Sequence, residues 1–147
     1  MAEEVVVKEQ LAPEMMAAGH ALTRRLRQDK DFELLCSLWL YTSERNGWRL
    51  EVGTPLVENS GPIHTYQLIR GIMGEDWPAE WEIQLSSISL LRSNHALVQG
   101  LRSLGHFEIQ ELPQGPRPSS MVRALKRIGP TRVQDVFIED AYIYFIK

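Results

Sequence analysis

Hydrophobic and polar positions alternate most regularly between residues 33 and 54. Positions 34–41 alternate between two sets of side chains that are both mostly apolar, as in a central strand that is covered on both faces. Asn46-Gly47 indicates a tight turn, because both residues tolerate a positive φ angle. Positions 48–53 alternate between an apolar face and a more polar one. The pattern therefore predicts a β-hairpin over residues 33–54.

Three other segments have the three-to-four-residue apolar spacing of an amphipathic helix. The predicted helices are residues 13–29, residues 62–73, and a third that begins after Ser93 or Asn94 and stops at Gly105. Pro13 and Pro62 suit the first turn of a helix, where the missing N–H costs nothing. Gly74 suits the position after a helix, because glycine adopts the left-handed conformation there.

The remaining segments have weaker patterns. A strand is expected within residues 83–91 and a short one within residues 106–112, and the proline-rich residues 113–118 are expected to form a loop. In residues 119–128 the apolar spacing favours a short helix, capped by a serine and stopped by Gly129-Pro130, although a strand stays open.

The last fifteen residues are rich in β-forming side chains. Glu139-Asp140 interrupts them, either as a turn between two strands or as a bulge within one long strand. The apolar terminal strand is also a candidate for homodimerisation, by pairing with a second copy across a free sheet edge.

Strands near both ends of the chain, with helices between them, predict an α+β fold with a mainly antiparallel sheet and three or four helices. The length of 147 residues suits one domain, which is expected to span residues 1–147. Residues 1–10 are a candidate flexible segment and residues 113–118 an internal loop. No internal repeat or low-complexity tract is present.

Composition and charge exclude several classes of protein. A hydrophobic content of 44% is too high for a disordered chain, and a net charge of −3 does not mark a polybasic protein. A single cysteine, Cys36, cannot form an internal disulfide or a cysteine-rich zinc site. We expect no targeting segment and no membrane span, because the first residues lack a signal-peptide pattern and no apolar stretch reaches the length that a span needs. We therefore expect a cytoplasmic protein in which Cys36 is reduced.

The sequence offers no catalytic motif. Four histidines, at positions 20, 64, 95 and 106, are scattered without metal-ligand spacing. Cys36 lies in the most apolar strand, where burial raises a thiol's pKa instead of activating it. There is no nucleophile elbow, P-loop or dinucleotide-binding fingerprint. No catalytic residue, metal or cofactor is predicted, and an enzyme would need a site assembled from distant residues.

Acidic residues and two tryptophans gather in one segment. Residues 71–91 contain four acids and no lysine or arginine. The candidate protein-interface residues are Trp77, Trp81, Glu75, Asp76, Glu80 and Glu82. Tryptophan often carries much of the binding energy of an interface, so the segment is suited to a basic partner. The competing interpretation is that both tryptophans cover the core beneath a long loop.

Basic residues gather near the end of the chain. Residues 113–134 contain five bases and no acid. The candidate nucleic-acid-binding residues are Arg117, Arg123, Lys126, Arg127 and Arg132. A second basic group, diluted by Asp29 and Asp31, consists of Arg24, Arg25, Arg27 and Lys30. Either group is able to contact phosphate, and the competing interpretation is a solvated surface.

Several short motifs resemble a group of small bacterial proteins to which no activity is assigned. The motifs are Leu38-Trp39-Leu40-Tyr41, Gly47-Trp48-Arg49-Leu50, Thr54-Pro55-Leu56-Val57, Gly61-Pro62 and Glu139-Asp140-Ala141-Tyr142-Ile143-Tyr144. The resemblance covers about half of the chain. It implies a bacterial source and a single α+β domain, and it supplies no activity, substrate or site residue.

These observations favour a small cytoplasmic binding or accessory module that is not catalytic and acts through a protein interface. We expect a protein partner or self-association, and we expect no interaction with a membrane. The first alternative is a nucleic-acid-associated protein that uses the basic segment 117–132. The second is a hydrolase or nuclease with a dispersed site.

Overall fold

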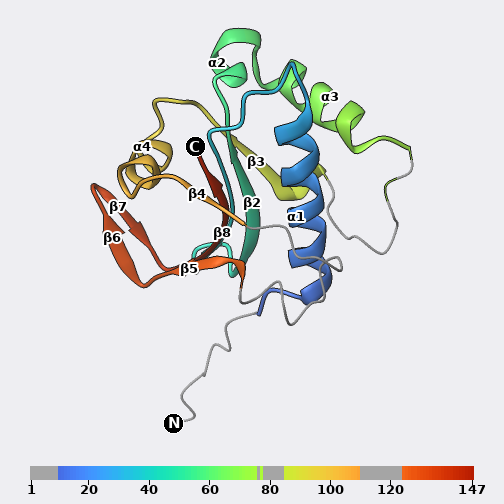
Figure 1. Cartoon of the computed structure of the whole chain (residues 1–147). Helices are drawn as coiled ribbons and strands as arrows, with labels where there is room; N and C mark the ends of the chain where they lie inside the picture. Colours follow the sequence, from blue (N-terminus) through green and yellow to red (C-terminus); the bar gives the residue numbers. More distant parts are fainter. Residues whose placement is uncertain (1–9, 76, 78–84, 110–123) are drawn as a thin grey trace.

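A mixed β-sheet divides the molecule into two layers of packed side chains (Figure 1). The computed structural model describes residues 10–75, 77, 85–109 and 124–147. The strands are β1 (Cys36–Thr42), β2 (Gly47–Gly53), β3 (Ile88–Leu91), β4 (Phe107–Glu108), β5 (Lys126–Ile128), β6 (Thr131–Val133), β7 (Val136–Ile138) and β8 (Asp140–Ile146). The helices are α1 (Pro13–Gln28), α2 (Leu56–Ser60), α3 (Pro62–Met73) and α4 (Ala96–Ser103), with a 3₁₀ turn at Leu85–Ser87.

The main sheet has six strands in the order β3-β2-β1-β8-β4, and β5 also pairs with β8. Only β2 and β3 run parallel, and the other pairs are antiparallel. Strands β6 and β7 form a second, two-stranded sheet. The predicted α+β domain with a mainly antiparallel sheet is confirmed, with four helices among the described residues.

The predicted hairpin over residues 33–54 is confirmed. Strand β1 pairs with β2 from Cys36 opposite Gly53 to Thr42 opposite Gly47, and Asn46 in the turn has a φ angle of 48°. The second neighbour of β1 is β8. Strand β1 lies between two strands and both of its faces are covered, which explains why both sets of alternating side chains are apolar.

Strand β8 lies in the interior of the sheet. It pairs with β1 on one side and with β4 and β5 on the other, and all seven of its residues are buried. The expectation that this strand offers a free edge to a second copy is therefore wrong. The backbone hydrogen-bonding groups of β8 are used within the chain, and the burial of its side chains on both faces of the sheet accounts for its continuous apolar sequence.

A bulge in β8 brings two consecutive aromatic side chains to the face that α1 covers. The register moves from Ser37 opposite Phe145 to Leu38 opposite Ile143, so Tyr144 is the extra residue. The Tyr144 hydroxyl accepts a hydrogen bond from Trp39 Nε1 at 2.9 Å and donates one to the Met16 carbonyl at 2.6 Å. This buried bridge joins α1 to the centre of the sheet.

Strands β5 to β8 form one long, bent ribbon. Strand β5 pairs with β8 and β6 pairs with β7, with the bend between residues 128 and 131 on one strand and at Glu139 on the other. Gly129 has a φ angle of 121°, and a Cβ there would lie 2.6 Å from the Glu139 carbonyl oxygen. A residue with a side chain therefore cannot fit at position 129, where the chain passes close to the Glu139 backbone. Glu139 therefore forms a bend that joins β7 to β8, and these two strands lie in different sheets and do not pair with each other.

The two faces of the sheet bury separate cores. Helices α1 and α3 cover one face, and their apolar side chains pack against residues such as Trp39, Leu50 and Tyr142. Helix α4 and the ribbon end β6–β7 cover the other, where Leu38, Leu101 and Ile143 meet. Figure 1 shows α1 and the β6–β7 end on opposite sides of the sheet.

Residues 126–128 form strand β5, so the helix that the apolar spacing favoured for residues 119–128 is wrong for this part. Pairing with β8 supplies these residues with backbone partners and overrides the local pattern. Residues 119–123 and the expected loop at 113–118 lie outside the described residues. The short helix α2 was not predicted. No helix in the described part of the chain is both long and apolar enough to cross a membrane.

Candidate functional site

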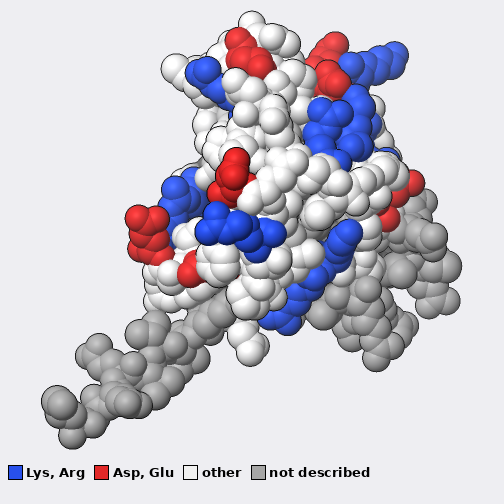
Figure 2. Space-filling view, turned by 90° about the vertical axis from the view of Figure 1, so that its left-hand side faces the viewer, with Lys and Arg blue, Asp and Glu red and all other residues white. Residues whose placement is uncertain are grey.

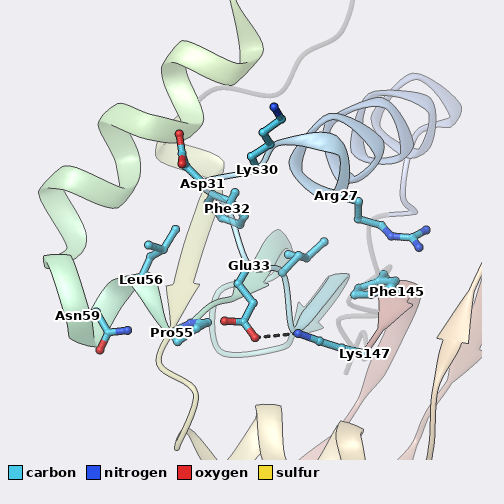
Figure 3. A pocket seen from close by; sticks show the side chains of 11 residues that line it. Arg27, Lys30, Asp31, Phe32, Glu33, Pro55, Leu56, Asn59, Phe145 and Lys147 are labelled. Carbon is cyan, nitrogen blue, oxygen red and sulfur yellow. Dashed lines mark hydrogen bonds and ion pairs between the residues drawn. The ribbon is translucent and has the colours of Figure 1, made fainter.

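A surface cleft of about 530 Å³ opens at the end of the sheet where β1 begins and β8 ends. Four segments form its walls: the end of α1, the connection from α1 to β1, the start of α2 and the end of β8 (Figure 3). The lining residues are Arg27, Lys30, Asp31, Phe32, Glu33, Leu34, Pro55, Leu56, Asn59, Phe145 and Lys147. This volume is within the range of ligand-binding clefts.

Local hydrogen bonds fix the connection that forms one wall of the cleft. The Asp31 N–H donates to Asp29 Oδ1 at 2.9 Å, so the chain turns directly after α1. The Leu35 N–H then donates to the Gly53 carbonyl at 2.8 Å, and the Lys147 N–H donates to the Leu35 carbonyl at 2.9 Å. These bonds bring the end of β8 beside the connection, although more than 100 residues separate them in sequence.

The apolar floor of the cleft combines buried and half-buried side chains. Phe32, Leu34 and Phe145 are only 5%, 5% and 6% exposed, and Pro55 and Leu56 are half-buried. In Figure 3, Pro55, Leu56 and Phe32 lie on one side of the Glu33–Lys147 pair, and Phe145 lies on the other. A ligand in the cleft would therefore meet apolar surface beneath a charged rim.

Arg27 is held in a defined position on this rim. Its guanidinium lies 4.4 Å from the centroid of the Phe145 ring, and its NH2 group donates to Glu108 Oε2 at 2.6 Å. The ion pair is exposed, with 39% and 47% of the two side chains accessible. Exposed pairs contribute about 0–1 kcal/mol, so another carboxylate is able to replace Glu108.

The other two cations of the rim are Lys30 and Lys147. Lys147 Nζ contacts Glu33 Oε1 at 2.7 Å, with both side chains about half exposed. Lys30 is exposed and makes no ion pair with the described residues. The lining contains three cations against the two carboxylates of Asp31 and Glu33. The cleft therefore favours an anionic group that lies near an apolar side chain.

The structure describes two of the six predicted protein-interface residues. Trp77 is half-buried against the core on the α1 side, with the Arg25 guanidinium 5.1 Å from its ring centroid. Glu75 is exposed. The other four, Asp76, Glu80, Trp81 and Glu82, lie outside the described residues. The interface at this segment stays a prediction.

Three of the predicted nucleic-acid-binding residues lie on the bent ribbon. Lys126 and Arg127 are neighbours on β5, where consecutive side chains point to opposite faces, and Arg132 is exposed on β6. Lys126 and Arg127 therefore lie on a strand and not on the short helix that the apolar spacing of residues 119–128 favoured. Arg127 donates two hydrogen bonds to Asp140, which raise the pKa of the guanidinium further. Arg117 and Arg123 lie outside the described residues.

Two buried groups are natural candidates for acid–base or nucleophilic chemistry. Burial raises the pKa of the Cys36 thiol to about 12. Burial also raises the pKa of Glu51, against the opposing effects of Arg45, Arg49 and a hydrogen bond with Ser89. No group of three His, Cys, Asp or Glu side chains suited to a metal ion occurs among the described residues.

Cys36 is expected to be inert in the folded protein. Its side chain is 0% exposed, and its pKa of about 12 leaves little thiolate at pH 8. Reaction with DTNB at pH 8 should therefore be at least ~100-fold slower than with free cysteine. The control is the same reaction in guanidinium chloride, where one thiol should react rapidly. Rapid reaction without denaturant would contradict the burial of this residue.

The structure is an α+β domain with a cleft at one end of its sheet that has a charged rim and an apolar floor. No family model, no curated protein and no solved structure matches the chain. The function must therefore be argued from the chemistry of the cleft. Sequence reasoning identified Arg27 and Lys30 as part of a basic group. It missed Glu33, Phe145 and Lys147, because only the topology brings them together.

Proposed function

We propose that the protein is a small cytoplasmic binding module, without catalytic activity, that holds an acidic and partly apolar segment of a partner protein in this cleft. The observation that carries the proposal is the pairing of three cations with an apolar floor in one cavity of about 530 Å³. Acidic side chains of the segment would replace Glu108 and Glu33 as partners of Arg27 and Lys147.

The exchange of partners is energetically accessible. Both resident ion pairs are exposed and each contributes little to stability. Arg27 is already oriented by its contact with the Phe145 ring, so less side-chain entropy is lost when it binds a new carboxylate. Lys30 adds a cation that no described carboxylate neutralises.

A polypeptide fits this site better than a small molecule. Small-molecule pockets usually enclose most of their ligand behind mostly apolar walls. Here, five charged residues on the rim, Arg27, Lys30, Asp31, Glu33 and Lys147, are all exposed. Four separate chain segments support an open surface along which an extended chain is able to lie (Figure 3).

Peptide selection tests the proposal. A phage-displayed library of random peptides, selected on the immobilised protein, is expected to yield sequences in which acidic residues flank apolar ones. A synthetic copy of the most enriched peptide is then titrated by fluorescence anisotropy. Its Kd should rise about tenfold for the Lys30→Glu/Lys147→Glu variant, because two attractive charges become repulsive. Higher salt should weaken the binding of the unaltered protein.

The matched control is Arg70→Glu, which reverses an exposed charge on α3 outside the cleft and should leave the Kd unchanged. Equal affinity of the cleft variant and the unaltered protein would contradict the proposal. Labelled single-stranded DNA in the same assay tests the nucleic-acid alternative. Binding of this DNA that Lys126→Glu abolishes and the cleft variant does not would favour that alternative.

A further inference from the structure

The outer surface of the ribbon end β6–β7 exposes a large aromatic side chain. On the inner side, Val133 and Ile138 are buried against α4 and the sheet. On the outer side, Arg132 and Phe137 lie opposite one another in the strand register, and Phe137 is 58% exposed. Leaving a phenylalanine this exposed forgoes much of the stabilisation that burial provides. Phe137 is therefore a candidate centre of an interface.

A groove of about 480 Å³ runs beside Phe137. It lies between β7 and the end of the β1–β2 hairpin, and it is lined by Leu40, Tyr41, Thr42, Ser43, Glu44, Phe137 and Glu139. Leu40 is half-buried, and the Glu139 carboxylate accepts a hydrogen bond from the Ser43 hydroxyl at 2.6 Å. The groove thus combines the apolar side chains of Leu40 and Phe137 with an acidic bank, formed by Glu44 of the hairpin end and by the Glu139 carboxylate, which reaches Ser43 from the bend after β7.

The charges around Phe137 have opposite signs on its two sides. Arg132 lies on β6, Glu44 lies in the hairpin end, and the Glu139 carboxylate reaches the hairpin end from the bend after β7, where it accepts a hydrogen bond from Ser43. Arg132 and Glu44 are exposed and make no ion pair with the described residues. Figure 2 views the molecule from the side on which β6, β7 and α4 lie, and it shows separate small groups of basic and acidic side chains with uncharged surface between them.

We propose that this surface is the interface of a homodimer with two-fold symmetry. In such a dimer the same patch faces itself. When the axis passes beside Phe137, the two phenylalanines pack against each other and against the apolar part of the facing groove. The same rotation places Arg132 of each copy against the acidic bank of the other copy. The patch has a basic residue on one side of Phe137 and acidic residues on the other, so two copies related by the two-fold axis place opposite charges against each other.

A second copy matches this surface better than the other classes of partner. A basic peptide would use the acidic bank but meet repulsion at Arg132. A nucleic acid would use Arg132 but meet repulsion at Glu44 and Glu139. A second copy satisfies both signs at once. This proposal does not depend on the cleft, since none of the cleft residues lies in the groove.

Sedimentation velocity over a range of concentrations tests the dimer. The unaltered protein is expected to associate with a Kd on the order of 10 μM, as for a small interface. Phe137→Ser should raise the Kd at least about tenfold, while its circular dichroism spectrum stays unchanged because the side chain is exposed. A protein that stays monomeric at ~1 mM overturns the proposal.

A charge-exchange experiment identifies the partner. Arg132→Glu and Glu44→Arg should each be monomeric alone, because each places like charges opposite one another across the interface. An equimolar mixture of the two variants should form a heterodimer, since both facing pairs then have opposite signs. Homodimers of both single variants, or a mixture that stays monomeric, would overturn the proposed symmetry.

Discussion

Gly19→Ala is expected to destabilise the protein by about 2–3 kcal/mol, which is the effect of overpacking a tight core. A Cβ at this position of α1 would overlap the Tyr144 hydroxyl oxygen and would lie 2.7 Å from Trp39 Nε1. Both side chains are held in their hydrogen-bonded bridge. The helix would have to move away from the sheet, and that movement would weaken the bridge to the Met16 carbonyl. Urea unfolding measures the change in the free energy of unfolding.

Gly71→Ala is the matched control for this substitution. Gly71 also lies within a helix, α3, but a Cβ there would meet no atom within 4 Å. Since alanine favours the helix, this variant should be more stable by up to about 1 kcal/mol. Equal unfolding midpoints for the two variants would contradict the close contact between α1 and the sheet. Combining Gly19→Ala with Tyr144→Phe should be non-additive, because the hydroxyl causes part of the clash.

Arg127→Ala is expected to destabilise the protein by about 2–3 kcal/mol. The Asp140 carboxylate has 4% of its side chain exposed and receives bonds of 3.1 and 2.9 Å from Arg127. Removing one partner of a buried pair costs ~3–5 kcal/mol. Because 59% of the Arg127 side chain is exposed, water would replace part of the lost interaction, and we expect a loss of stability smaller than for a fully buried pair.

The control for this prediction is Arg132→Ala, which removes an exposed arginine four residues beyond β5 along the same ribbon and is compared at concentrations where the protein is monomeric. Its effect should stay within about 0.5 kcal/mol. Arg127→Lys keeps the charge but cannot donate two parallel hydrogen bonds to Asp140, so its loss of stability should lie between those of Arg127→Ala and Arg132→Ala. An Arg127→Ala protein as stable as Arg132→Ala would mean that Asp140 does not need this partner. Urea unfolding at neutral pH distinguishes these outcomes.

The elements that could be predicted from the sequence are those whose signals are local. The hairpin over residues 33–54 has its alternation and its turn within one short stretch, and α1 and α3 have both their apolar stripe and their terminal prolines. Strand β5 could not be predicted in this way, because its three residues become a strand only by pairing with β8. The bulge at Tyr144 likewise depends on the register with β1.

The candidate cleft could be predicted only in part for the same reason. Arg27 and Lys30 are neighbours in the sequence, so their basic character is visible without a structure. Lys147 and Phe145 join them because β8 ends beside the connection from α1 to β1. Arg127 shows the opposite case, since a residue that looked available for phosphate is bound to a buried carboxylate. Charge in a sequence does not show which charges are already paired.

The interior position of β8 also constrains how the protein is made. Residues 140–146 complete the sheet by pairing with β1, about 100 positions earlier in the chain. Until those residues have left the ribosome, the edge of β1 that faces β8 has no partner strand, and β1 is held only from its other side, by β2 and β3. During synthesis, the nascent chain therefore exposes an apolar edge of β1 that is able to pair with other chains. Chaperones that bind extended apolar segments would have their main opportunity in this interval.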